Sequence, residues 1–192
     1  VEILENYKAL VKTFSKDSIV FNEGEKAEYY YQIIEGDIKM FNLTEDGKEF
    51  VQGYFSNNKS FGEPPLFGDY KYPASAFSIS DSKVYKLPKN TFFELLKNHP
   101  KIHLNFTKLL CKRMVYKATI MKEVSIYPPE HRILTLLNHL KENSSSSKDY
   151  EVTLTRQQIS DLTGLRVETV IRAIKKLEKS NKLYIKERKV YL

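Results

Sequence analysis

Residues 154–178 read Leu-Thr-Arg-Gln-Gln-Ile-Ser-Asp-Leu-Thr-Gly-Leu-Arg-Val-Glu-Thr-Val-Ile-Arg-Ala-Ile-Lys-Lys-Leu-Glu, a pattern that predicts two short helices joined by a tight turn. Thr155 and Gln158 have capping-box spacing, in which each side chain hydrogen-bonds the other residue's backbone N–H. Gly164 can adopt the positive φ that ends a helix. Apolar residues at helical spacing are expected to bury one face of each helix: Ile159 and Leu162 in the first, and Val170, Ile171, Ile174 and Leu177 in the second.

The second helix, which starts near Arg166, carries mostly polar residues on the rest of its surface. About 12 residues at 1.5 Å each make it about 18 Å long. The N-terminal end of such a helix can enter the major groove of DNA while the preceding helix crosses the backbone. A helical hairpin in a protein core is the alternative; the turn spacing, polar face and basic excess favour nucleic-acid binding. The polar candidates are Arg166, Glu168, Thr169, Arg172, Lys175 and Lys176.

The positive charge of the chain is concentrated in its last third. Net charge is +7, and residues 126–192 hold 13 Lys and Arg against 8 Asp and Glu, an excess of five. This asymmetry is expected if only that part meets phosphate. Cys111 is the single cysteine, which excludes an intramolecular disulfide and argues against an iron–sulfur cluster. No apolar run approaches 18 residues, so we expect a cytoplasmic protein without a membrane partner.

Between residues 18 and 87, short apolar or aromatic runs alternate with turn signals, a pattern typical of a β-roll or barrel. Asp46-Gly47 is the strongest two-residue hairpin signal in the chain. Residues 2–12 precede this region with the apolar spacing of an amphipathic helix. The predicted strands are 19–21, 29–34, 38–43, 50–55, 74–79 and 83–87.

The run Phe61-Gly62-Glu63-Pro64-Pro65-Leu66-Phe67-Gly68 is predicted to be a loop within the β region. Proline lacks an N–H and has a fixed φ, so the loop should be preset rather than mobile. It could line a ligand pocket with backbone N–H groups and the Glu63 carboxylate. A rigid corner of the barrel is the alternative.

A short helix is predicted over 91–96, and a long one from Pro100 to about Ser125, about 26 residues or about 39 Å. One apolar stripe runs along the long helix and is suited to a dimer seam. Packing of the stripe on the chain's own barrel is the alternative. The stripe consists of Ile102, Phe106, Leu110, Met114, Ala118, Met121 and Val124.

Tyr127-Pro128-Pro129 should break the long helix and mark a hinge. An amphipathic helix over 131–141, a serine-rich loop over 143–147 and a short strand over 151–154 are expected before the two helices. After them, strands 183–185 and 190–192 form a predicted hairpin, or wing. Its basic tip, residues 186–189, is a candidate phosphate contact.

These residues make the chain resemble, over nearly its full length, the Crp–Fnr family of bacterial transcription regulators. The resemblance implies an α+β fold: a cyclic-nucleotide-binding-type β-roll (double-stranded β-helix) over 1–98, a long dimerisation helix and hinge over 99–127, and a winged helix-turn-helix over 128–192. The motifs that carry it are Phe21-Asn22-Glu23-Gly24-Glu25, Ile34-Glu35-Gly36, Thr44-Glu45-Asp46-Gly47, Phe61-Gly62-Glu63, Leu154-Thr155-Arg156-Gln157-Gln158-Ile159 and Glu168-Thr169-Val170-Ile171-Arg172.

The resemblance implies a homodimer that binds double-stranded DNA at a palindromic operator, with RNA polymerase as a candidate partner. Glu168 and Arg172 take base-reading positions, where Arg suits guanine and Glu suits cytosine. Val167 stands where the cyclic-AMP receptor has a base-reading arginine, and Arg166 replaces a helix-capping serine. The family's phosphate contacts fall on Arg156, Gln157, Thr169 and Lys175, and the implied dimer interface on Phe106, Leu110, Met114 and Met121.

The effector pocket departs from the family pattern. Pro73 and Ala74 fill the two places where nucleotide-binding members have Arg-Ser or Arg-Thr, whose guanidinium binds the cyclic phosphate. We therefore expect an effector other than cyclic AMP, or a constitutive regulator with a vestigial pocket. The candidate pocket residues are Gly62, Glu63, Pro64, Pro65, Leu66, Pro73, Ala74 and Ser75.

An enzyme is not expected. A cupin-like metal oxygenase would need two or three histidines inside the roll, and residues 1–98 contain none. His99 and His103 are not a clean ligand pair, because Pro100 places His99 before the long helix begins. We expect no metal and no cofactor, haem included.

Overall fold

The computed structural model describes residues 2–45, 47, 49–142, 144 and 150–192. The chain divides into two compact units, Val1–Leu110 and Cys111–Leu192, and the boundary falls within one long helix. Within the described ranges, no helix has the length and apolar character needed to cross a bilayer. The predicted turn residue Asp46, and residues 143 and 145–147 of the predicted serine-rich loop, lie outside these ranges.

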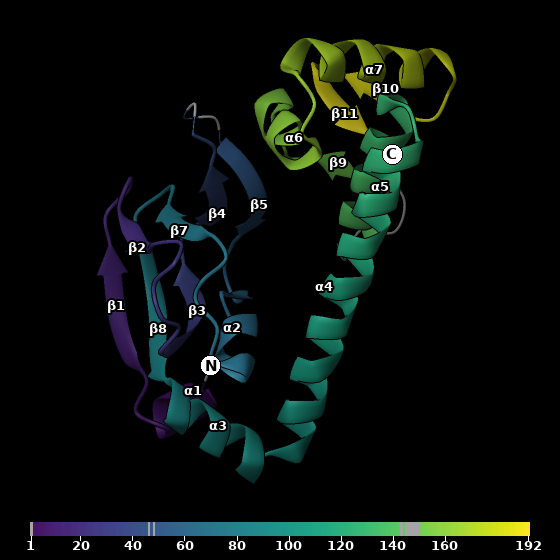
Figure 1. Ribbon diagram of the computed structural model, residues 1–192. Helices are drawn as coiled ribbons and strands as arrows, with labels where there is room; N and C mark the ends of the chain where they lie inside the picture. Colours follow the sequence, from purple (N-terminus) through teal and green to yellow (C-terminus); the bar gives the residue numbers. More distant parts are fainter. Residues whose placement is uncertain (1, 46, 48, 143, 145–149) are drawn as a thin grey trace. The chain divides into compact units, whose positions relative to one another are not determined.

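Two antiparallel four-stranded sheets make up the β-roll of the first unit, as the sequence predicted (Figure 1). One sheet has the order β1-β8-β3-β6 and the other β2-β7-β4-β5. β4 pairs with β5 from Ile38↔Phe55 to Leu43↔Glu49, which confirms a hairpin around Gly47. The strands are β1 (Leu10–Phe14), β2 (Ile19–Phe21), β3 (Tyr29–Glu35), β4 (Ile38–Leu43), β5 (Glu49–Phe55), β6 (Ser60–Phe61), β7 (Ser75–Ser78) and β8 (Ser82–Pro88).

The interior of the roll is apolar and rich in aromatic rings. Successive side chains of a strand point to opposite faces of the sheet, and the inward-facing Ile33, Ile38 and Val84 are fully buried. Phe61 is also fully buried, and its ring stacks on that of Tyr31 with 5.5 Å between centroids. This packing gives the roll a core without any contribution from the second unit.

The predicted helix over 2–12 is wrong beyond Asn6, because α1 spans only Glu2–Asn6. Lys8 takes a positive φ of 57°, which ends the helical path, and β1 begins at Leu10. There Leu10 pairs with Lys86 and Val11 with Tyr85 along β8. A distant strand therefore overrides a local helical pattern.

The predicted loop over 61–68 contains a short helix, α2 (Pro64–Gly68). Its two prolines occupy the first helical positions, where a missing N–H costs nothing. α3 (Lys89–Asn98) follows β8 and extends the predicted short helix at both ends. The long helix α4 (Pro100–Ile126) begins at Pro100 and ends next to the Tyr127-Pro128-Pro129 break, as predicted.

The apolar stripe of α4 divides into two parts with different environments. Phe106 is buried, and Ile102 and Leu110 pack against the core of the roll. Met114 and Met121 expose 70% and 71% of their surface. Packing on the chain's own roll, the alternative considered from the sequence, thus accounts for the first turns of α4, whereas Met114 and Met121 on its second half remain exposed.

The second unit packs three helices on a small antiparallel sheet of order β10-β11-β9. On α7, Val170, Ile174 and Leu177 are buried as predicted. Ile171, which was also predicted to be buried, is 40% exposed. Ala173 is buried instead, because it lies at i+3 from Val170 on the same helix face as Ile174 and Leu177. The elements are α5 (Pro129–Glu142), β9 (Glu151–Val152), α6 (Arg156–Thr163), α7 (Val167–Lys179), β10 (Tyr184–Lys186) and β11 (Lys189–Tyr191).

Candidate nucleic-acid interface

The start of α6 is held by the predicted capping box. The Gln158 N–H donates to Thr155 Oγ1 at 3.1 Å, and the Thr155 N–H donates to Gln158 Oε1 at 2.8 Å. At the other end Gly164 has a φ of +67° and ends the helix. The Ser160 hydroxyl then donates to the Leu165 carbonyl at 2.5 Å. The turn between α6 and α7 is therefore fixed by contacts over short sequence distances.

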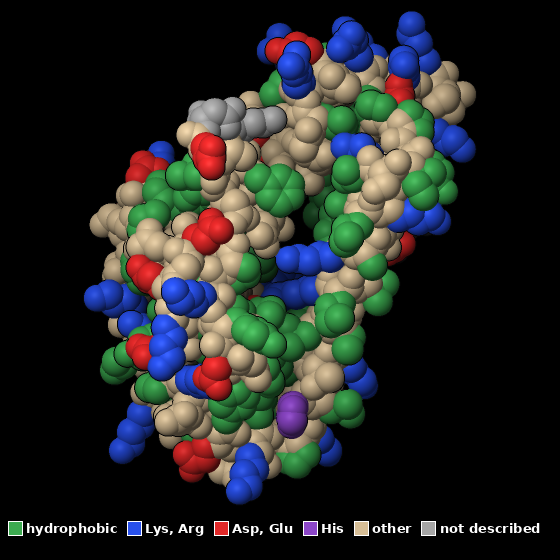
Figure 2. Space-filling model, in the orientation of Figure 1, with side chains coloured by type: hydrophobic (Ala, Val, Ile, Leu, Met, Phe, Trp, Pro, Cys, Tyr) green, Lys and Arg blue, Asp and Glu red, His purple; other side chains and the backbone are tan. Residues whose placement is uncertain are grey.

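α7 presents a polar, mostly basic face to solvent (Figure 2). Arg166 occupies the N-cap position, and its side chain makes no capping hydrogen bond to the described backbone. The predicted base-reading residues Glu168 and Arg172 are exposed one turn apart, and Arg172 Nε donates to the Glu168 carbonyl at 3.4 Å. Lys175 is exposed as well, whereas Val167 and Thr169 are partly buried.

Lys176 differs from the other predicted contact residues of α7 because its side chain is ion-paired with a residue of another helix. Its Nζ lies 2.6 Å from Glu130 Oε1, an ion pair that joins α7 to α5. The hydrogen bond from Lys176 lowers the pKa of the Glu130 carboxyl below its ordinary value. The sequence placed Lys176 on the polar face of α7 but gave no sign of this partner on another helix.

Arg156 and Gln157 lie in the first turn of α6, where the Gln157 amide donates to Asp161 Oδ1 at 2.7 Å. Arg156 is partly buried, and burial lowers the pKa of its guanidinium. A cavity of about 350 Å³ lies between this turn, β9 and the wing, and it is lined by Arg156, Arg188 and Lys189 among others. The sequence predicted a basic wing tip; the structure brings it beside Arg156.

The hairpin β10–β11 confirms the predicted wing. Its turn residues Glu187 and Arg188 have φ values of 50° and 66°, the conformation that two-residue hairpin turns need. Lys189 is paired with Glu151 of β9 at 2.6 Å. Arg188 is exposed at the tip.

In the first unit, the predicted pocket loop begins with a glycine that the packing requires. Gly62 has a φ of +72°, and a Cβ there would lie 2.8 Å from Phe21 Cζ. The next residue, Glu63, is 1% exposed although it carries a carboxylate. Pro65 and Leu66 are buried as well, whereas Pro64 is exposed.

The second predicted pocket segment is held by hydrogen bonds to neighbouring strands and turns. Asn42 Nδ2 donates to the Pro73 carbonyl at 2.7 Å, and the Glu23 N–H donates to Ser75 Oγ at 2.9 Å. Ala74 is fully buried. Of this segment, Pro73 is exposed and Ser75 is partly exposed.

An aromatic cluster that the sequence analysis missed lies beside both pocket segments. The rings of Phe21 and Tyr72 stack with 3.7 Å between centroids, and both lie against Gly62. Burial raises the pKa of Tyr31 to about 12 and also raises that of Tyr72. Tyr31 and Tyr72 therefore stay neutral. The available signal in the sequence was the recurrence of Tyr and Phe through the β region.

α2 connects the pocket loop to the long helix within the first unit. Phe67, 45% exposed, stacks on Phe106 of α4 with 5.8 Å between centroids. It also makes an edge-to-face contact with Phe93 of α3 at 5.1 Å. Phe67 therefore places α2 in direct contact with the first half of α4.

The histidines have partners of several kinds. His99 contacts the Tyr7 hydroxyl at 3.3 Å, and His131 Nδ1 lies 2.5 Å from the buried Glu123. His139 stacks on Tyr116. In the described part of the chain, no three His, Cys, Asp or Glu side chains are grouped so that they could hold a metal ion.

Each of the two units contains a range that matches a known protein family. Residues 11–99 match the cyclic nucleotide-binding domain family, and residues 131–192 match the Crp-like helix-turn-helix domain family. These two ranges contain the β-roll and the capped helix pair described above.

Full-length relatives show the same order of domains. The chain is 28% identical to the cAMP-activated global transcriptional regulator CRP of Pasteurella multocida, over 88% of this chain and 82% of that protein. It is 25% identical to the fumarate and nitrate reduction regulatory protein of Yersinia pestis, over 95% and 74%. The solved structure of OCPA-complexed CprK superposes with a TM-score of 0.77 at 25% identity, over 100% and 91%. With its nucleotide-binding-type roll and its Crp-type helix pair in this order, the chain belongs to the Crp–Fnr family of DNA-binding transcription regulators.

Proposed function

We propose that the chain is a sequence-specific regulator that binds a palindromic operator as a homodimer. The observation that carries this proposal is the exposed face of α7, where Glu168, Arg172 and Lys175 stand on a helix whose other face is buried. Such a helix can enter a major groove without exposing its apolar side. In a dimer, two of these helices meet successive grooves one turn apart.

Each residue of the interface has a distinct proposed role. Arg172 donates to guanine O6 and N7, and Glu168 accepts from cytosine N4–H₂. Val167 contacts a thymine methyl in place of the family's base-reading arginine. The phosphate contacts come from Arg156, Gln157, Thr169 and Lys175, with Arg166 added at the start of α7.

The exposed methionine face of α4 supports dimerisation. Met114 and Met121 are seven residues apart on one face of the helix, and both are largely exposed. Seven-residue spacing is that of a two-stranded coiled coil, which would bury both methionines and Val124 against the partner's copies. RNA polymerase is a further candidate partner, through surfaces that neither dimer seam nor operator covers.

We infer that the effector, if the pocket binds one, is not cyclic AMP. The argument is the absence of a guanidinium at Pro73 and Ala74, together with the full burial of Ala74. An alternative, favoured by the stacked Phe21 and Tyr72 rings next to Gly62, is a constitutive regulator whose pocket is filled by its own side chains. Native mass spectrometry of the purified protein separates the two. A stoichiometric bound molecule supports effector control, and a bare dimer that binds DNA tightly supports the alternative.

The proposed DNA contact is tested by selecting a consensus from random oligonucleotides and then substituting Arg172. Arg172→Ala is expected to cost about 1–3 kcal/mol at the selected site and little on random DNA, because only base contacts carry sequence information. The matched control is Lys179→Ala at the far end of the same helix, which should leave the preference unchanged. Equal losses on selected and random DNA would refute base reading by Arg172.

A further inference from the structure

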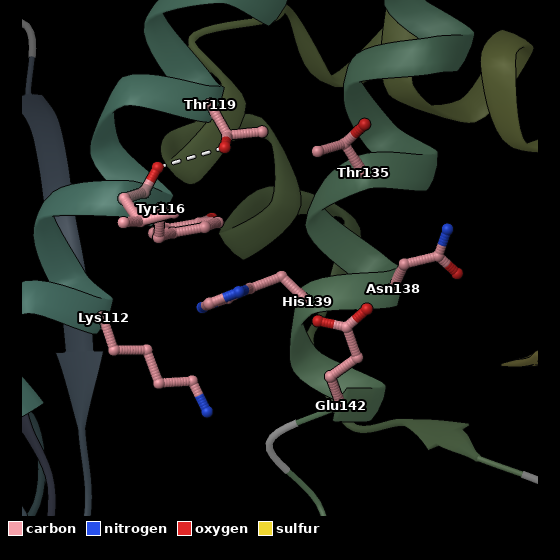
Figure 3. Close-up of a pocket in the computed structure, with 8 residues that line it drawn as sticks. Lys112, Tyr116, Thr119, Thr135, Asn138, His139 and Glu142 are labelled. Atoms are coloured by element: carbon pink, nitrogen blue, oxygen red, sulfur yellow. Dashed lines mark hydrogen bonds between the residues drawn. The ribbon is translucent and has the colours of Figure 1, made fainter. Parts of the chain in front are cut away.

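A cavity of about 340 Å³ lies between α4 and α5 in the second unit (Figure 3). Small-molecule sites in proteins begin at about 300 Å³. The cavity is remote in sequence from the loops that the β-roll offers to an effector. Its principal lining side chains are Lys112, Tyr116 and Thr119 from α4, and Thr135, His139 and Glu142 from α5.

A pair of stacked rings forms one wall of the cavity. Tyr116 and His139 lie parallel, with 3.7 Å between centroids and 15° between planes. Burial raises the pKa of Tyr116 to about 12. Burial, assisted by Lys112, lowers the pKa of His139 below its ordinary value. Both rings are therefore neutral near pH 7 and present a flat surface suited to an apolar group.

The rim of the cavity carries one positive and one negative side chain. Lys112 projects from α4 and Glu142 from α5, and both act on the charge state of His139 between them (Figure 3). Neither makes an ion pair with any residue of the described ranges. A ligand with one charge would be attracted by one of these groups and repelled by the other, whereas a zwitterion satisfies both.

The cavity also offers a hydroxyl group, and it lies on a face of α4 that the proposed dimer would not cover. The Thr119 hydroxyl donates to the Val115 carbonyl at 3.0 Å, so its oxygen can still accept from a ligand ammonium. Lys112, Tyr116 and Thr119 follow i, i+4, i+7 spacing, on a different face of α4 from Met114 and Met121. A dimer formed along the methionines would leave the cavity open.

We propose that this cavity binds a small zwitterion with an apolar side chain, of the α-amino acid class. Its carboxylate meets Lys112, its ammonium meets Glu142, and its side chain lies against Tyr116 and His139. The bound ligand would connect α4, the helix proposed to dimerise, with α5, the first helix of the DNA-binding core. The effect of the ligand on DNA affinity rests on the proposed function, whereas the binding of the ligand to the cavity does not.

The test is calorimetric titration of the full chain, without DNA, using four probes. L-phenylalanine and L-leucine carry both charges, 3-phenylpropanoate lacks the ammonium, and 2-phenylethylamine lacks the carboxylate. At least one amino acid is expected to bind with one site per chain and a Kd below about 1 mM, and each singly charged probe about tenfold more weakly than L-phenylalanine. The proposal is overturned if neither amino acid binds, or if all three phenyl probes bind equally.

Paired variants assign the charges. Lys112→Gln should weaken L-phenylalanine about tenfold and leave 2-phenylethylamine no weaker, because it also removes a like-charge repulsion. Glu142→Gln should weaken L-phenylalanine and leave 3-phenylpropanoate no weaker. Lys108→Gln, one turn earlier on α4 and also exposed, is the matched control. Equal losses for Lys108→Gln and Lys112→Gln would contradict the site. Circular dichroism and operator binding, measured separately, show whether each variant is folded and whether the proposed function stands.

Discussion

Thr155 illustrates how one side chain sets the position of a whole helix. Its hydroxyl and the Gln158 amide close the capping box at the start of α6. Thr155→Ala should lower the free energy of unfolding by about 1 kcal/mol, because a helix N–H loses its acceptor. Urea denaturation measures this, with Thr153→Ala, an exposed neighbour outside the cap, as control. If both variants unfold alike, the cap does not contribute.

His139 should make the stability of the second unit depend on pH. Its pKa in the folded protein is lowered by burial and by Lys112, against a partial opposing effect of Glu142. Between that lowered pKa and the ordinary value of 6.5, the unfolded chain binds more protons than the folded protein. The free energy of unfolding therefore rises with pH through this range, and the contribution of His139 is complete above pH 6.5.

His139→Phe, which keeps an aromatic ring against Tyr116, should lose this part of the pH dependence. Urea denaturation of both proteins from pH 5 to pH 8 measures the difference in slope. His103→Phe, at an exposed position on α4, should retain the wild-type slope. The same slope in wild type and His139→Phe would show that His139 is not the group responsible.

At the scale of the element, α4 combines two roles along one helix. Phe106 anchors its start to the roll and touches Phe67 of α2, while Met114 and Met121 remain exposed further along. The helix therefore connects the predicted pocket loop to the proposed dimer seam without an intervening flexible segment in the described structure. A change at α2 could thus alter how the two copies of α4 pack.

The double variant Met114→Glu/Met121→Glu should be monomeric. Burial of four carboxylates in an apolar seam costs several kcal/mol, which a two-helix contact cannot offset. Sedimentation velocity at micromolar concentration gives the oligomeric state. Lys108→Glu changes the same helix at an exposed position off the methionine face and should stay dimeric. A dimeric double variant would place the interface elsewhere.

At the scale of the molecule, the basic excess of residues 126–192 should make operator binding strongly salt-dependent. Each Lys or Arg that neutralises a phosphate adds about 0.9 to the slope of log Kd against log salt. Lys175→Gln removes two such contacts per dimer, so the slope should fall by about 2 and selected and random DNA should weaken alike.

Fluorescence anisotropy at several salt concentrations measures the slope. Lys97→Gln, an exposed lysine of the first unit with the same charge change, should leave the slope unchanged. An affinity that does not vary with salt would contradict phosphate binding by the second unit altogether.

Local interactions explain what was predictable. The capping box at Thr155, the positive φ of Gly164 and the break at Tyr127-Pro128 each depend on residues within four positions of one another. The alternation of strands and turns is also a local pattern in the sequence, and it predicted the roll. Helix period also predicted the buried face of α7, except at Ile171, which lies one position outside that face.

The amino-acid sequence by itself determined the order of the elements apart from β1, β6 and α2, the main caps and breaks between them, and the polar face of α7, since these depend on backbone preferences and periodicity. The tertiary structure alone decided which partners distant residues meet: β1 on β8, Lys176 on Glu130, and Arg156 beside Arg188. It also divided one continuous apolar stripe between a buried Phe106 and an exposed Met121. Periodicity specifies which face of a helix is apolar but carries no information about what covers that face.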